Sequence, residues 1–304
     1  MTALLGRFVA TTLPLVPKPI VRKVASRYVA GDTLEDALDT MRTLAAEGAM
    51  GTMDVLGESV THRDQTVATR EEYLRTIDAI AASSLPANIS VKPTAIGLAI
   101  DPALALENGA AICTRAASHG MFVRFDMEDS PYTEATLDLV LALRERFEAV
   151  GAVLQAYLRR SLSDLDRLLA KKINVRICKG IYVEPRSIAW KDRETIIRAF
   201  AALVDKQLAG GGYAAIATHD EACVQLALAT IDRLRVPKDH YEFQMLLGVD
   251  PVLRKSLLDT GHRLRVYVPY GRDWYAYSTR RLKENPTIAG QILKSMVGLG
   301  PAEA

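Results

Sequence analysis

The sequence predicts an α/β protein built as a (β/α)8 barrel, with a helical arm at its N-terminus. Three observations predict this fold. The chain has 304 residues, enough for one large domain or two small ones. It contains eight short apolar runs rich in β-branched residues, and a segment with the apolar period of a helix follows each run. Eight strand–helix units over roughly 250 residues are typical of a closed barrel of parallel strands.

The predicted elements follow one another in a regular order. Eight strands are expected at residues 51–57, 87–92, 122–126, 151–157, 174–178, 214–218, 241–246 and 264–268. Helices are expected at residues 70–84, 102–119, 133–147, 161–172, 193–208, 221–234, 250–260 and 274–285, the last continuing toward 297. Asp101-Pro102, Ser130-Pro131 and Asp250-Pro251 are typical helix starts, because Asp and Ser cap helices and proline is tolerated in the first turn.

An open, doubly wound sheet is the main alternative architecture. It usually has fewer strands, and its dinucleotide-binding form needs a glycine-rich turn directly after the first strand. Residues 210–215 match that turn loosely, but they precede a predicted strand instead of following one. We interpret them as a helix end and a loop. The sequence also contains no phosphate-binding GxxxxGK(S/T) loop, no HExxH motif and no calcium loop.

Residues 1–46 form the predicted arm, and residues 47–304 form the predicted barrel domain. Basic residues of the arm, among them Arg22 and Arg27, lie beside apolar ones. Two interpretations stay open: an arm that lies on a membrane surface, and a helical arm that docks on the protein or its neighbour. Three prolines interrupt the apolar stretch 8–16, so no signal peptide is expected. No apolar run reaches the ~18 residues of a membrane-spanning helix.

The composition is that of an ordinary soluble globular protein, with 49% apolar and 24% charged residues. The net charge is only +2, and basic residues do not interleave with aromatic ones, so no nucleic-acid partner is expected. Cys113, Cys178 and Cys223 lie far apart without CxxC spacing. This argues against a disulfide framework and against a metal site, and a reducing cytoplasm fits such cysteines best.

Polar residues gather where the predicted strands end, the edge at which barrel enzymes have their active sites. In chain order they are Lys92, Asp126, Gln155, Tyr157, Arg176, Lys179, Tyr182, Thr218, His219, Asp220, Gln244, Tyr267, Arg280 and Arg281. Each has a structural interpretation too, such as a turn lysine, a carboxylate that accepts backbone donors, or a helix cap. Together they predict a cationic rim suited to an anionic substrate and an anionic cofactor. The neutral hydrogen-bonding side chains among them suit the edge of a heterocycle.

The chain resembles the proline dehydrogenases, flavoenzymes that oxidise L-proline to Δ1-pyrroline-5-carboxylate. The resemblance covers about residues 48–285. It rests on Ser90-Val91-Lys92-Pro93, Phe125-Asp126-Met127-Glu128, Gln155-Ala156-Tyr157, Arg176-Ile177-Cys178-Lys179-Gly180-Ile181-Tyr182, Ala217-Thr218-His219-Asp220, Phe243-Gln244-Met245-Leu246, Tyr267-Val268-Pro269 and Tyr277-Ser278-Thr279-Arg280-Arg281. The chain is similar to the stand-alone form of the family, not to its fusion with an aldehyde dehydrogenase.

The resemblance implies a substrate site and a catalytic pair. Arg176 and Asp126 would be the catalytic residues, with Arg176 near flavin N5. The substrate residues would be Lys92, Asp126, Tyr182, Leu247, Tyr267, Tyr277, Arg280 and Arg281. Among them, the arginine pair would clamp the proline carboxylate and two tyrosines, 182 and 267, would pack on the ring. By the same resemblance, Tyr267 would favour proline over hydroxyproline.

The resemblance also implies FAD as the cofactor. The residues that would hold it are Gln155, Arg176, Lys179, Gly180, Thr218, His219, Gln244 and Glu284. Hydride would pass from the ring carbon beside nitrogen to flavin N5. One departure from the family is Ile181, where many members carry alanine, and this bears on fine substrate preference.

Electrons would then pass to a quinone-type acceptor, which makes the basic and apolar arm a candidate for peripheral contact at the cytoplasmic face of the inner membrane. Self-association is left open. Two other functions are also kept in view. A barrel aldolase would use Lys92 or Lys179 as a Schiff-base nucleophile without a flavin, and a non-catalytic barrel would act as a binding or regulatory module. The colour of the purified protein separates them, since only a flavoprotein is yellow.

Overall fold

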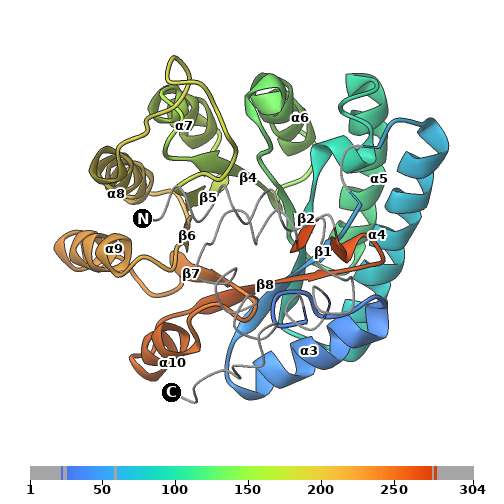
Figure 1. Cartoon of the computed structure of the whole chain (residues 1–304), viewed down its shortest axis with the longest axis horizontal. Coiled ribbons are helices and arrows are strands. Elements are labelled where there is room, and N and C mark those ends of the chain that lie inside the picture. Colours follow the sequence, from blue (N-terminus) through green and yellow to red (C-terminus); the bar gives the residue numbers. More distant parts are fainter. Residues whose placement is uncertain (1–21, 23–25, 58–59, 276, 279–304) are drawn as a thin grey trace, which may run out of the picture.

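The computed structural model describes residues 22, 26–57, 60–275 and 277–278 of the chain. Eight parallel strands form a closed barrel in the order in which they occur in the sequence, and β8 closes on β1 (Figure 1). The strands are β1 (Met50–Val55), β2 (Ala87–Val91), β3 (Val123–Phe125), β4 (Val150–Gln155), β5 (Asn174–Cys178), β6 (Ala214–Ala217), β7 (Tyr241–Leu246) and β8 (Leu264–Tyr270). All eight predicted strands are present with ends within two residues of those expected, so the predicted fold class is confirmed.

Helices surround this barrel on the outside (Figure 1). They are α3 (Leu34–Ala46), α4 (Arg63–Ser83), α5 (Pro102–Ser118), α6 (Thr133–Arg144), α7 (Ser161–Ala170), α8 (Arg193–Ala209), α9 (Glu221–Leu234) and α10 (Pro251–Asp259). Asp101 and Asp250 cap α5 and α10 as expected, each accepting a backbone N–H of the first turn. The final predicted helix is described only at residues 274–275 and 277–278. No helix among the described residues is long and apolar enough to cross a membrane.

One predicted helix start and one predicted helix cap were wrong. Helix α4 begins at Arg63, seven residues before the expected start at residue 70. The prediction missed this start because the first turn is mostly exposed and shows no apolar period. Gln65 caps this end, accepting the backbone N–H of His62 at 3.2 Å. Ser130-Pro131 starts a 3-10 turn, η3 (Ser130–Tyr132), and not α6. The Ser130 hydroxyl donates to the Glu184 carboxylate at 2.6 Å instead of capping α6.

Helix α3 lies within the segment predicted as the arm, and it packs against β8 and β1 (Figure 1). Thr33 and Asp36 form a capping box at its start, in which each side chain accepts the other's backbone N–H. Met41 is fully buried and reaches Gly51 on β1 so closely that a Cβ there would lie 2.0 Å from its sulfur. The glycine therefore makes room for the Met41 side chain where this helix meets the barrel.

The barrel strands alternate between two kinds of side chain. Val123 and Phe125 on β3 belong to the apolar core, while Arg124 between them bonds to β4 and β5. Because successive side chains of a strand point to opposite faces, one set faces the helices and the other the barrel interior. The interior set is polar on several strands: Thr52, Asp54, Asn88, Ser90, Lys92, Arg124, Asp126, Asn174, Arg176, Glu242, Gln244, Arg265 and Tyr267. The barrel interior is thus charged, and the apolar core lies outside it.

Candidate active site

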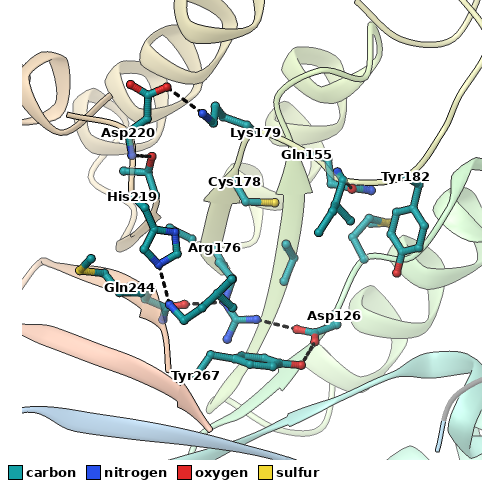
Figure 2. Close-up of a pocket in the computed structure, with 18 of the residues that line it drawn as sticks. Asp126, Gln155, Arg176, Cys178, Lys179, Tyr182, His219, Asp220, Gln244 and Tyr267 are labelled. Atoms are coloured by element: carbon teal, nitrogen blue, oxygen red, sulfur yellow. Dashed lines mark hydrogen bonds and ion pairs between the residues drawn. The ribbon is translucent and has the colours of Figure 1, made fainter. Parts of the chain in front are cut away.

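A cavity of about 800 Å³ opens where the strands end (Figure 2). Its volume lies in the upper part of the range of roughly 300–1,000 Å³ that is usual for ligand sites. Twelve of the predicted site residues line it: Lys92, Asp126, Gln155, Arg176, Lys179, Gly180, Tyr182, Thr218, His219, Gln244, Tyr267 and Tyr277. Seven strands, β2 to β8, bring them to one place.

Asp126 is the centre of the charged part of the cavity (Figure 2). Arg176 Nη1 donates to its Oδ1 at 2.6 Å, and Ser90 Oγ donates to the same oxygen at 2.6 Å. The Tyr267 hydroxyl donates to its Oδ2 at 3.0 Å. Burial opposes the ionisation of Asp126, but attraction by Arg176 and Lys92 and the two hydroxyl donors outweigh it and lower its pKa. Burial raises the pKa of Tyr267 well above its usual value, so its hydroxyl stays protonated and donates.

Lys92 joins this network from β2. Its ammonium donates to the Tyr267 hydroxyl at 3.1 Å and forms an ion pair with Asp54. Asp54 lies on β1, is 0% exposed, and also accepts from Tyr73 at 3.3 Å. Burial raises the pKa of Asp54 against the attraction of Lys92. A continuous row therefore runs from Asp54 through Lys92 and Tyr267 to Asp126.

Asp54 was not predicted from the sequence. An informative signal was present, because an aspartate at an alternate position of an apolar strand faces a barrel interior and needs a cationic partner there. The same alternation identifies Arg124, Glu242 and Arg265. Asp220, expected at the strand-end rim, also lines the cavity. Other wall residues that were not predicted are Met127, Val153, Cys178, Ile181, Arg193, Ala217, Glu221, Ala222, Met245 and Leu246. Half of these lie on the strands themselves, and Arg193, Glu221 and Ala222 lie in the first turns of α8 and α9. A search for polar residues at strand ends does not reveal apolar strand residues or helix starts.

The wall beside β4 and β5 carries neutral hydrogen-bonding groups. Gln155 donates to the backbone oxygen of Glu128 at 2.9 Å and accepts from Ile181 N at 3.4 Å. Gly180 has a φ of +109°, and a Cβ there would lie 2.1 Å from the Tyr157 ring. The turn after β5 therefore requires glycine, which lets the backbone of Ile181 face Gln155 across the cavity wall.

The opposite wall is formed where β6 meets α9. Asp220 caps α9 and accepts from Lys179 at 2.8 Å and from Arg193 at 2.7 Å, and these contacts lower its pKa although burial opposes this (Figure 2). His219 Nε2 accepts the backbone N–H of Leu246 at 2.8 Å. The neutral ring then carries its proton on Nδ1. Lys179 and Arg193 are both partly exposed to solvent. Asp220, their carboxylate partner, is held in place because it caps α9.

Four predicted site residues are not placed on the cavity. Leu247 is half-buried, bonds through its backbone to Tyr267 and does not contribute to the wall. Arg280, Arg281 and Glu284 lie outside the described residues. Tyr277, just before them, is buried against Val29 and Leu56 and reaches the cavity.

A closed (β/α)8 barrel with a deep, ion-paired cavity at the carboxyl ends of its strands is the architecture of a barrel enzyme. The family model for proline dehydrogenase matches residues 37–294 of the chain. The chain belongs to the proline dehydrogenase family and is an oxidoreductase of that class. The resemblance seen in the sequence is confirmed.

Known relatives extend over most of the chain. It is 38% identical over 273 residues to proline dehydrogenase 1 of Bacillus subtilis subsp. natto, covering 90% of each protein. It is 36% identical over 279 residues to the proline dehydrogenase of Deinococcus radiodurans, again covering 90% of each. Among solved structures, proline utilization A of Bdellovibrio bacteriovorus superposes with a TM-score of 0.81 at 23% identity, which shows a shared fold. The match covers 87% of this chain and 33% of that longer protein.

The family assignment disfavours the two other functions considered. Lys92 and Lys179 each donate to a carboxylate in an ion pair. A Schiff-base lysine attacks as a neutral amine, so neither contact favours an aldolase.

Proposed function

We propose that this chain oxidises L-proline to Δ1-pyrroline-5-carboxylate with FAD as its cofactor. The observation that carries the proposal is the convergence of Lys92, Asp126, Arg176 and Tyr267 with neutral hydrogen-bonding side chains in one cavity, in a chain of this family. The cationic part suits a carboxylate, and the neutral part suits the edge of a ring system.

The residues present fit FAD. The donors and acceptors along one side, which are Gln155, Lys179, Gly180, Thr218, His219 and Gln244, suit a polar heterocycle and its phosphate-bearing chain. Lys179 and Arg193 supply positive charge at the mouth, where an anionic phosphate would replace Asp220 as their partner. FAD, when bound, accepts a hydride at N5. Glu284 stays in the proposed cofactor set from the sequence resemblance.

The substrate would lie against the charged network. Lys92, Arg280 and Arg281 would hold the proline carboxylate, and the rings of Tyr182 and Tyr267 would pack on the pyrrolidine ring, with Tyr277 beside them. Leu247 stays in the proposed set from the resemblance alone. Holding the carboxylate at one end fixes the reacting carbon at the other, which is a positioning effect.

The chain's own residues also prepare the amine. The amine must be neutral to release a hydride, and neighbouring cations disfavour its protonated form. Asp126 is bonded by Arg176, Ser90 and Tyr267, so its charge is engaged and is not directed at the amine. Arg176 places a fixed positive charge in the cavity, which stabilises negative charge that develops during the reaction.

The test is anaerobic reduction by proline. The purified protein is expected to be yellow, and excess proline is expected to bleach the flavin band at neutral to alkaline pH without NAD+. Absence of bleaching in a protein that retains its FAD would overturn the proposal. A colourless protein that does not bind added FAD would favour the non-flavin functions.

A second part of the proposal concerns the acceptor. A quinone would receive the electrons, and the basic and apolar arm would contact the membrane surface or a second copy of the chain. Because α3 packs on the barrel, the deletion that tests this should end at residue 21. We expect dye reduction to persist and quinone reduction in vesicles, or the oligomeric state, to change. Loss of dye reduction in a folded, FAD-loaded variant would place the arm in the active site.

A further inference from the structure

Glu242 is a buried carboxylate that does not line the cavity. It lies on β7, is 2% exposed, and is held by the Arg265 guanidinium, with Nε at 2.8 Å from Oε1 and Nη2 at 3.1 Å from Oε2. The Tyr213 hydroxyl donates to Oε2 at 3.1 Å. On the cavity side, the side-chain amide of Gln244 also donates to Oε1 of Glu242. Glu242 thus connects the closed end of the barrel interior to a cavity residue.

The charge of Glu242 decides how the Gln244 amide is turned. Burial opposes ionisation of Glu242, but Arg265 outweighs it and holds the pKa of Glu242 below its ordinary value. An ionised carboxylate only accepts hydrogen bonds, so the NH2 group of Gln244 must face it. The amide oxygen then faces the other way, toward Arg176 Nε, which donates to it. Without this fixed acceptor, only Arg176 would favour this orientation of the amide.

The orientation of the amide matters because Arg176 is a donor only. A Gln244 amide turned around would direct its NH2 group at Arg176 Nε–H, and two donors repel. In the observed orientation Nε bonds to Gln244 while Nη1 bonds to Asp126 at 2.6 Å and to Ser90 at 3.2 Å. These contacts on two sides of the planar guanidinium fix its plane within the cavity (Figure 2).

We propose that Glu242 is a positioning residue for the reaction: it fixes the orientation of the Gln244 amide and, through it, that of the Arg176 guanidinium. The inference rests on the proposed function, because it concerns how Arg176 meets the cofactor and substrate. Glu242 itself touches neither, and its effect must pass through Gln244.

The test is a double-mutant cycle between Glu242→Gln and Arg176→Lys. The glutamine side chain is isosteric with that of Glu242 but has one acceptor oxygen in place of two. Its NH2 group must therefore face either Arg265 Nε and Gln244, or Arg265 Nη2 and Tyr213. We expect Glu242→Gln to lower kcat/KM for proline about 10- to 100-fold, the loss expected for one charge-assisted hydrogen bond. In the Arg176→Lys background the same change should alter kcat/KM by less than about threefold, because the guanidinium it orients is gone.

A spectroscopic measurement without proline accompanies the kinetics. The visible absorption spectrum of the oxidised flavin is expected to shift in the same direction in Glu242→Gln as in Arg176→Lys. The matched control is Tyr213→Phe, which removes another hydrogen bond of Glu242 on the side away from the cavity. It should leave the spectrum and kcat/KM at wild-type values, whatever it does to thermal unfolding.

The outcomes separate the two proposals. Additive effects of Glu242→Gln and Arg176→Lys, or a wild-type spectrum in Glu242→Gln, would overturn the positioning role and leave a stability role. If Glu242→Gln does not fold, Gln244→Met breaks the same link with Arg265 still paired, and additivity with Arg176→Lys would again overturn it. If proline does not reduce even the wild-type enzyme, the proposed function fails, and the spectral comparison alone decides the role of Glu242.

Discussion

The interior of the barrel contains two charged layers that use arginine differently. The lower layer, Arg124, Asn174, Glu242 and Arg265, is closed off from the cavity. Arg124 donates to the backbone oxygens of Ala152 and Asn174 at 2.9 and 2.8 Å, and Arg265 donates to that of Gly51 at 2.7 Å. The upper layer, Lys92, Asp126, Arg176 and Tyr267, lines the cavity. Its cations donate to side chains.

The contrast indicates what each layer is able to do. A backbone carbonyl of a barrel strand has no freedom to leave, so an arginine bonded to it acts as a brace between strands. A side-chain partner at a cavity wall is exchangeable, because a ligand anion can replace it or add to it. The arginines of the lower layer are therefore expected to govern stability and the cations of the upper layer activity, while Glu242 is linked to the upper layer through Gln244.

The largest effect is expected in the upper layer from Arg176→Lys. Lysine keeps the positive charge beside Asp126 but not the planar fork that bonds to three partners. Losing two charge-assisted hydrogen bonds of roughly 1.5–3 kcal/mol each should lower kcat/KM for proline about 10²–10⁴-fold. Steady-state kinetics with a dye acceptor, normalised to FAD content, measure it. A kcat/KM within about threefold of wild type would remove Arg176 from the mechanism.

The same substitution in the lower layer should have the opposite signature. Arg124→Lys leaves buried carbonyl oxygens without donors, and each such group costs roughly 1–3 kcal/mol. Denaturant unfolding should show a free energy of unfolding lower by about 2–4 kcal/mol. Burial and nearby arginines lower the pKa of Arg124 to about 9, and the lysine of the variant meets the same unfavourable surroundings. An activity loss comparable to that of Arg176→Lys would show that the two layers are not separate.

The pH dependence of stability sharpens the comparison within the cavity. The pKa of Asp126 is lowered on folding, so the stability it contributes is present above its unfolded pKa of about 3.9 and is lost as the pH falls through the folded value. The pKa of Asp54 is raised, so folding is disfavoured as the pH rises from about 3.9 through that higher value. The two carboxylates therefore give the free energy of unfolding opposite slopes against pH.

Denaturant unfolding across a pH series tests these signs. Asp126→Asn should lose less stability than wild type on acidification below about pH 4. In wild type, Asp54 makes the free energy of unfolding fall as the pH rises above about 4, and Asp54→Asn should remove this fall. Changes of the same sign in both variants would contradict the assignment of a lowered pKa to Asp126 and a raised pKa to Asp54.

The smallest effect is expected outside the barrel and gives the baseline for both layers. Arg198 and Glu194 form an ion pair on α8, with side chains 76% and 71% exposed. Exposed helix pairs of this spacing contribute roughly 0.3–0.5 kcal/mol. Arg198→Ala should therefore change the free energy of unfolding by less than about 1 kcal/mol and leave kcat/KM unchanged. If Arg198→Ala lowered the free energy of unfolding by more than this, denaturant unfolding could not distinguish the buried layers from exposed ion pairs.

Much of the fold could be predicted because its signals are local. Strand β7 and helix α9 have the bounds expected from apolar period and capping. Lys92, Arg176 and Gln244 were expected at one edge because parallel strands of a barrel end on the same side. The start of α4 was not predicted correctly, since its mostly exposed first turn carries no apolar period.

The amino-acid sequence alone was enough to predict the eight-strand barrel, its carboxyl-edge cavity and the family to which the chain belongs. The pairings inside the barrel became known only from the folded structure: Lys92 with Asp54, Arg176 with Asp126, and Gln244 with Glu242. The cause is barrel closure. Asp126 and Tyr267 lie 141 positions apart in the chain, and β3 and β8 are not neighbours, so their side chains meet only across a closed interior. Alternation along each strand shows which residues face inward, but closure determines which of them touch.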